Sequence, residues 1–270
     1  MKSLDSYPIP KTTLHSPLLY VAALLLLAAA AFSFPGLPTI WDPDAHQAIL
    51  KSLYDSGVGG NALQTWLWVD LILRAGALLL PGSLAACLFL TLLPQIRGGE
   101  TAAARGLGIL RIFCRILAIV LMALSVFLAG LFLWRMTAYL IRCAKLNHGV
   151  FLAFGMIFYE CILGALSAVA LYFLIRTLLN ACDTMDTLRY TTLVGRPEAA
   201  GIHTGVMTML WTLGILGSIV GLTRLPEQAA CLSFQCSALA LILLAVFLRR
   251  YRRRMERLAW RMRQEAQETL

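Results

Sequence analysis

The chain has 270 residues, of which 59% are hydrophobic and 14% are charged, and its mean hydropathy is +0.75. Soluble domains are about 45–50% apolar and about 25% charged, so this composition excludes an ordinary soluble globular protein and favours a chain solvated by lipid. The net charge is +9, and residues 249–270 contribute eight Arg and three Glu to it. The sequence therefore predicts an all-α, polytopic transmembrane helix bundle with a basic C-terminal tail.

The N-terminal segment contains two lysines, Lys2 and Lys11, before an apolar run from Leu18 to Phe34. Such a segment is either a cleaved signal peptide or a first membrane helix that the mature protein keeps. The residues that follow, FSFPGLP, contain no small-x-small cleavage pattern, and further apolar runs come after them. We therefore expect a retained first helix.

Stretches of about 20 residues with few charges are candidate membrane spans. The sequence contains six, at approximately 18–34, 72–94, 116–134, 150–175, 202–222 and 229–248. The first is short and the fifth is rich in glycine and threonine, so five spans is the competing count. On this interpretation residues 1–248 form a single transmembrane domain and residues 249–270 form a cytoplasmic tail.

The distribution of charge predicts that both termini lie in the cytoplasm, because short cytoplasmic loops are enriched in Lys and Arg. Basic residues follow the second span at Arg97, Arg105, Arg111 and Arg115. The loop 35–61 carries three aspartates against one lysine, which suits the outer side. One segment disagrees with this orientation and contains Arg135, Arg142 and Lys145. The strongly basic tail carries more positive charge than that segment, so both termini are still predicted to lie in the cytoplasm.

The outer loop contains a predicted amphipathic helix within WDPDAHQAILKSLYDSG, residues 41–57, which we expect to lie on the membrane surface. Asp42, Asp44 and His46 have side chains that could ligate a metal. A capped helix start explains the two aspartates equally well, so no metal site is predicted.

Asp70 and Arg74 are four residues apart, which puts them on one helical face where they can form an ion pair. An ion pair inside a membrane would line a pathway. Residues 75–94 suffice for a span, however, and Trp66 and Trp68 are typical of an interfacial belt. The pair is therefore expected near the outer headgroups.

Glu160 is the sharpest exception to the apolar pattern, because it lies within the otherwise uncharged run 150–175. At a rise of about 1.5 Å per residue, Glu160 is about 4 Å from the middle of that run. A charge there costs at least about 2.5–3.5 kcal/mol on insertion scales. Glu160 is therefore either protonated and hydrogen-bonded to a neighbouring helix, exposed to a wet cavity, or a proton carrier in a transport cycle.

Glycines recur along the fifth span at Gly201, Gly205, Gly214, Gly217 and Gly221. Small residues at such spacing let helix backbones approach closely, which predicts a tightly packed helix. A broken helix that forms a substrate site would also require glycine.

The tail is predicted to be a basic amphipathic helix, since apolar residues recur every three or four positions among the arginines. The arginines proposed to contact lipid or a partner are Arg249, Arg250, Arg252, Arg253, Arg254 and Arg257. Anionic lipid headgroups are the simplest ligand, since each Arg near the surface contributes about 1 kcal/mol. An acidic partner helix is the alternative, and no nucleic acid is expected.

Nucleotide-binding, zinc-protease and hydrolase motifs are absent from the sequence. We therefore expect no catalytic residues, no cofactor and no metal. The best interpretation is a non-enzymatic, multi-pass subunit or regulator in the cytoplasmic (plasma) membrane of a bacterium, packed against other membrane proteins. The alternative is a small proton- or cation-coupled transporter that uses Glu160.

Overall fold

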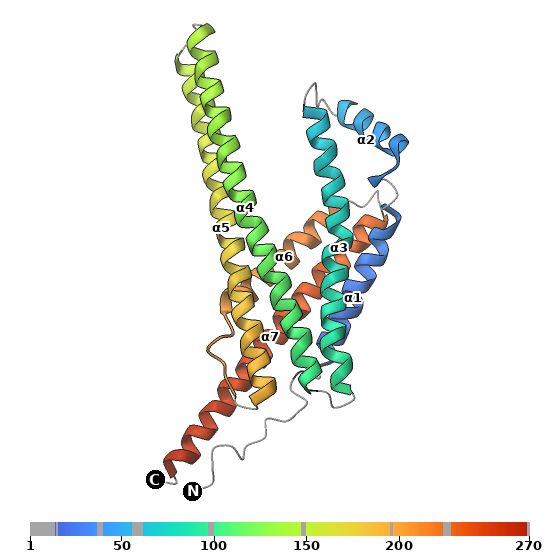
Figure 1. The fold of residues 1–270 in the computed structure, drawn as a ribbon, viewed down its shortest axis with the longest axis vertical. Coiled ribbons are helices and arrows are strands. Elements are labelled where there is room, and N and C mark those ends of the chain that lie inside the picture. The colour runs from blue at the N-terminus through green and yellow to red at the C-terminus, as the bar shows by residue number, and fades with distance from the viewer. Residues whose placement is uncertain are drawn as a thin grey trace.

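The computed structural model describes residues 14, 16–36, 40–55, 62–96, 100–146, 150–194, 197–223 and 228–268. Within these ranges the protein is helical and contains no β-strand (Figure 1). The elements are α1 (Pro17–Ser33), the 3₁₀ turn η2 (Phe34–Gly36), α2 (Pro43–Asp55), α3 (Ala62–Ile96), α4 (Glu100–Leu146), α5 (Val150–Val194), α6 (Thr204–Thr223) and α7 (Gln228–Glu268).

The described residues include six helices that are long and apolar enough to cross a membrane. Their candidate spans are Pro17–Gly36, Asp70–Pro94, Ala103–Ile141, Ile157–Val194, Thr204–Thr223 and Gln228–Glu265. The prediction of an all-α protein with six apolar spans is therefore confirmed. Helix α2 is not one of these six, and it corresponds to the short helix predicted in the outer loop.

Local sequence explains the start of α2. Pro43 is its first residue, and the preceding Asp42 accepts a hydrogen bond at Oδ1 from the Asp44 backbone N–H at 3.1 Å. That bond satisfies one of the amide groups that a helix start leaves without an intrahelical partner. The His46 ring bonds the Ile40 carbonyl through Nε2 at 2.9 Å. These contacts account for the three side chains that were considered as metal ligands.

The helices run alternately up and down (Figure 1). The lower end in that view contains the start of α1, the end of α3, the start of α4 and the ends of α5 and α7. The end of α1, the start of α3 and the tip of the α4–α5 hairpin point the opposite way. Helix α1 packs against both α3 and α7, α4 packs against α3 and α5, and α6 packs along α7.

The buried core lies toward the lower end of the bundle and joins helices that are distant in sequence. Small residues dominate the contact face of α1, where Ala22 and Ala23 are fully buried. The larger members of this core include Leu26, Leu92, Leu107, Leu110, Leu188, Ile202, Phe247, Tyr251 and Met255. Ser233 of α7 donates a hydrogen bond to the Ala29 carbonyl of α1 at 2.9 Å and bonds Ser33 Oγ at 2.7 Å.

Two predicted spans differ in length from the helices that contain them. The sequence indicated 116–134 and 150–175, whereas α4 has 47 residues and α5 has 45. Charged residues end a span without ending a helix, because Arg, Asp and Glu are tolerated in helices that leave the hydrocarbon. For the same reason α7 continues without a break through Arg249, where the tail was predicted to begin.

Candidate functional site

Glu160 of α5 faces α4, where its carboxylate meets a guanidinium. Arg135 Nη2 donates to Glu160 Oε1 at 2.5 Å, and the two side chains are 72% and 26% exposed respectively. Sequence reasoning noticed Arg135 only as a residue that contradicts the predicted orientation. The sequence signal that could have identified this pair is that Arg135 and Glu160, which carry opposite charges, lie in consecutive apolar runs.

The charge-free segments of the hairpin define the level at which this pair lies. Residues 116–134 of α4 and 161–175 of α5 contain no charged residue, and they measure about 28 and 22 Å at 1.5 Å per residue. The Arg135–Glu160 pair lies at the outer end of both segments. A bilayer centred on these two segments would have the pair at its edge, whereas one centred on the run 150–175 would have Glu160 near its middle.

A small pocket of about 60 Å³ adjoins the pair and is lined by Arg135, Met136, Tyr139, Ile157 and Glu160. Since a water molecule occupies roughly 30 Å³ in the liquid, the pocket has room for about two. Among the described residues, no group of three or more His, Cys, Asp or Glu side chains could hold a metal ion. The chemistry available here is that of an ion pair with no net charge beside a small pocket with a mainly apolar lining.

Asp70 and Arg74 form the second pair that the sequence predicted. Arg74 Nε donates to Asp70 Oδ2 at 2.7 Å, and each side chain is about one-third exposed. The contact lies within α3, four residues apart, so it satisfies both groups without involving another helix. Nothing connects it to the Arg135–Glu160 pair.

A third polar group lies where α4, α5 and the start of α6 meet. Arg111 Nη2 is 3.0 Å from Asp186 Oδ2, so Asp186 of α5 pairs with a residue of α4. His203 Nε2 is 3.6 Å from Asp183 Oδ2. These contacts connect the basic lower half of α4 to α5 and fix the entry into α6.

Three of the five glycines in the fifth span face α7. A Cβ at Gly214 would lie 2.6 Å from Ile242 Cγ1 and 3.0 Å from the Ala238 carbonyl oxygen, and one at Gly221 would lie 3.0 Å from Phe234 Cβ. Gly217 also adjoins Ala238, at ordinary contact distance. The glycine face therefore serves close packing between α6 and α7, and α6 is unbroken from Thr204 to Thr223.

The other two glycines have different surroundings. Gly201 precedes α6 and lies in a turn, so it is not part of the helix to which the sequence assigned it. A Cβ on Gly201 would be 1.8 Å from Thr187 Oγ1, because this turn packs directly on α5. Gly205 has only an ordinary contact, with Asn180 Nδ2. Only Gly214, Gly217 and Gly221 share a helix-packing role.

The tail is partly occupied by contacts within the protein. Tyr251 and Met255, on its apolar side, are buried in the same cluster as Leu188 and Ile202. The first two turns therefore bury their apolar side against the bundle, not in lipid. On another side, Arg252 Nε donates to Glu256 Oε1 at 2.8 Å.

The predicted site residues thus fall into separate places. Glu160 gains Arg135, Asp70 and Arg74 pair with each other, the glycines of α6 face α7, and the tail arginines lie beyond the core. Sequence reasoning missed Arg135 and the tail residue Arg261, which lies on the same face as three of the predicted arginines. Comparison of the chain with protein-family models, curated proteins and solved structures gives no match.

Proposed function

We propose that this chain is a non-enzymatic, multi-pass subunit or regulator of a membrane-protein assembly, and that the α4–α5 hairpin is the surface it offers to a protein partner. The observation that carries the proposal is the length of exposed apolar surface on this hairpin. That surface is longer than a bilayer is thick.

The excess can be estimated from α4. Large apolar side chains are exposed on it from Ile109 to Ile141, with Arg111, Arg115 and Arg135 interspersed among them, a distance of about 48 Å at 1.5 Å per residue. The hydrocarbon core of a bilayer is about 30 Å thick. Even at a tilt of about 40°, the upper end of the usual range, the apolar length projects to about 37 Å. Lipid tails therefore cover only part of it.

The contrast with the other long helices supports the same conclusion. About one third of the most apolar window of α1, α3 and α7 is buried inside the protein, against 6% for α4 and none for α5. The exposed side chains of the hairpin include Phe127 near the middle of α4, and Trp134 of α4 and Phe158 of α5 nearer its tip. Aromatic side chains of this kind are enriched at protein interfaces.

The proposal includes a cytoplasmic membrane in a bacterium, with both termini on the inner side. Its support is the asymmetry of charge. The start of α4 and the end of α5 lie at the lower end of the bundle in Figure 1, and these segments carry Arg105, Arg111 and Arg189, whereas the acidic helix α2 lies at the upper end. An excess of arginine on one side marks the cytoplasmic side of a membrane protein.

Transport through Glu160 has weaker support. The Arg135 guanidinium already lies beside the Glu160 carboxylate, and it would compete with any cation that this carboxylate binds. The adjoining pocket is about 60 Å³, which suits water and not a passage across the membrane. The subunit proposal requires no such passage.

The test is photo-crosslinking in the native membrane. Benzoylphenylalanine replaces Phe127 on α4 or Phe158 on α5, and as a matched control it replaces Leu27, an exposed apolar residue of α1. The proposal predicts a protein adduct of one discrete mass from both hairpin positions and only lipid adducts from Leu27. If all three positions give lipid adducts alone, lipid covers the hairpin and the proposal is wrong.

A further inference from the structure

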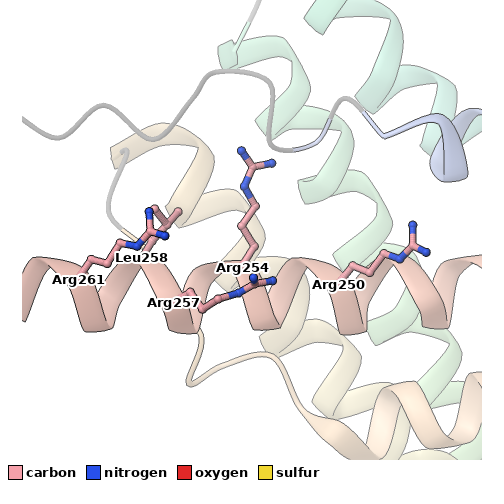
Figure 2. A pocket seen from close by; sticks show the side chains of 5 residues that line it. All are labelled: Arg250, Arg254, Arg257, Leu258 and Arg261. Atoms are coloured by element: carbon pink, nitrogen blue, oxygen red, sulfur yellow. The ribbon is translucent and has the colours of Figure 1, made fainter.

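The tail of α7 presents four arginines on one face. Arg250, Arg254, Arg257 and Arg261 follow one another at intervals of four, three and four residues, and all are exposed. At about 100° per residue they fall within a sector of about 60°. Figure 2 shows them along one stretch of the helix, with Arg254 extending away from it and Arg261 lying beside Leu258. We call these four residues the arginine face.

The arginine face lines an open hollow. Together with Leu258 it surrounds a volume of about 640 Å³, about ten times that beside Glu160. Of the five described side chains that line it, four are cationic and none is acidic. A ligand in this hollow meets the guanidinium groups on one side, the side of α7.

These cations have no counter-charge within the described part of the chain. No ion pair there includes Arg250, Arg254 or Arg261, and Arg257 Nε donates to a backbone carbonyl, that of Arg253, at 3.2 Å. Like charges three or four residues apart on a helix destabilise it by about 0.2–0.5 kcal/mol per pair. A bound anion removes that repulsion, so the arrangement favours an anionic ligand.

Phosphate fits this face better than an acidic protein helix does. Guanidinium groups bind phosphate oxygens through two parallel hydrogen bonds. A protein partner requires an apolar centre to its interface, and Leu258 is the only apolar residue that lines the hollow. The apolar side of this helix is already used, because Tyr251 and Met255 are buried in the core.

The position of the face along α7 also suits a headgroup. Arg250 comes two residues after Leu248, a buried residue of the core, so the first arginines follow directly on the apolar part of the helix. Burial of Tyr251 and Met255 holds this part of the helix against the bundle, and the arginine face is therefore presented in a defined direction.

We infer that Arg250, Arg254, Arg257 and Arg261 form a binding site for a phosphate group, supplied either by an anionic phospholipid headgroup or by free phosphate. This site is separate from the partner surface on the α4–α5 hairpin and does not depend on it. It also distinguishes among the tail arginines, since Arg249 and Arg252 lie on another side of the helix and Arg253 lies at the border of the arginine face.

The experiment measures binding to the purified full-length protein in a non-ionic detergent. The probes are dioctanoyl phosphatidic acid, dioctanoyl phosphatidylcholine and sodium phosphate. The face variant carries R250Q, R254Q, R257Q and R261Q. The matched control carries R249Q, R252Q, R253Q and R263Q, which removes the same charge from outside the arginine face, with Arg253 at its border. All eight side chains lie outside the buried core, and helix content by circular dichroism verifies that each variant folds.

The expected result is a loss of phosphatidic acid affinity of at least about tenfold in the face variant and less than about threefold in the control. Replacing the four face arginines by lysine retains the charge without the planar fork, so an intermediate loss is expected. Equal losses in the face and control variants would show that net charge alone attracts the lipid, and would overturn the site.

The probes also distinguish the source of the phosphate. Tight binding of phosphatidic acid with no competition from sodium phosphate identifies a lipid headgroup, and competition at millimolar phosphate identifies a soluble ligand. Phosphatidylcholine, whose phosphate is neutralised by its own choline, is expected to bind weakly. If neither phosphatidic acid nor sodium phosphate binds the wild-type protein, the inference is wrong and an acidic partner becomes the better explanation.

Discussion

Gly106 provides the sharpest test of how α3 and α4 cross. A Cβ at this position would lie 2.5 Å from Thr91 Oγ1, 2.7 Å from the Thr91 backbone nitrogen and 2.8 Å from its Cα. Two of these atoms belong to the backbone, so no side-chain rotation relieves the collision. Reaching an ordinary contact of 3.4 Å requires the helices to separate by about 0.7 Å.

The expected change in the free energy of unfolding follows from two opposing effects. Gly106→Ala gains about 0.5–1 kcal/mol because alanine loses less backbone entropy in a helix. Forcing an extra carbon into a packed contact costs about 1–3 kcal/mol. Gly130→Ala, on the same helix, isolates the first effect because nothing lies within 4 Å of its Cβ. We therefore expect Gly106→Ala to be about 1–3 kcal/mol less stable than Gly130→Ala.

The assay is unfolding of both variants in one detergent, followed by circular dichroism during titration with a denaturing detergent. Adding Thr91→Ala removes Oγ1 but neither backbone atom, so the double variant is expected to recover only part of the loss. Equal stability of Gly106→Ala and Gly130→Ala would refute the close crossing. Full recovery by Thr91→Ala would show that only the hydroxyl approaches Gly106.

Three further predictions concern single contacts. Ser233→Ala removes the bonds to Ala29 and Ser33 and is expected to lower the free energy of unfolding by about 0.6 kcal/mol, with an upper limit near 1.7. By contrast, the Ser83 hydroxyl bonds the Leu80 carbonyl of its own helix, so Ser83→Ala is expected to leave the unfolding midpoint unchanged. Arg111→Gln breaks the half-exposed ion pair with Asp186 and should lower the free energy of unfolding by less than about 1 kcal/mol. This loss of stability relative to wild type should shrink in 1 M salt, and a loss that persists in salt would point to packing instead of charge. An apolar maleimide should modify exposed Cys161 faster than buried Cys87, Cys114 or Cys182, as measured by peptide mass spectrometry; equal rates would contradict the burial of the three thiols.

Composition and spacing were sufficient for the helices but not for their partners. The apolar runs predicted the six long helices, and Asp42-Pro43 predicted the start of α2. Apolar periodicity carries no information on which helix lies beside which, because every span is apolar on all sides. The contact of α1 with α7, and the pairing of Arg135 with Glu160, depend on tertiary packing and could not be derived from either segment alone.

Helix ends were the least accurate part of the prediction for a physical reason. A search for membrane spans stops at charged residues, whereas hydrogen bonding within a helix does not. The span predicted at 150–175 stops before Arg176, whereas α5 itself continues to Val194, as the helical spacing of Asp186 and Arg189 indicates. Similarly, Gly201 was assigned to a helix from its spacing to Gly205, although the turn that contains it packs on α5 through Thr187.

The contact between the first and last helices has a consequence for biosynthesis. Ser33 and Ser233 bond across 200 positions of sequence, so the polar edge of α1 has no α7 to meet until almost the entire chain has been made. At about 5–20 residues per second, a ribosome takes roughly 10–40 s to cover that separation. During this interval α1 resides in the membrane with only α3 as a neighbour among its final partners. A nascent chain that stops before α7 therefore leaves the bundle open along α1, which makes truncated products natural substrates for membrane quality control.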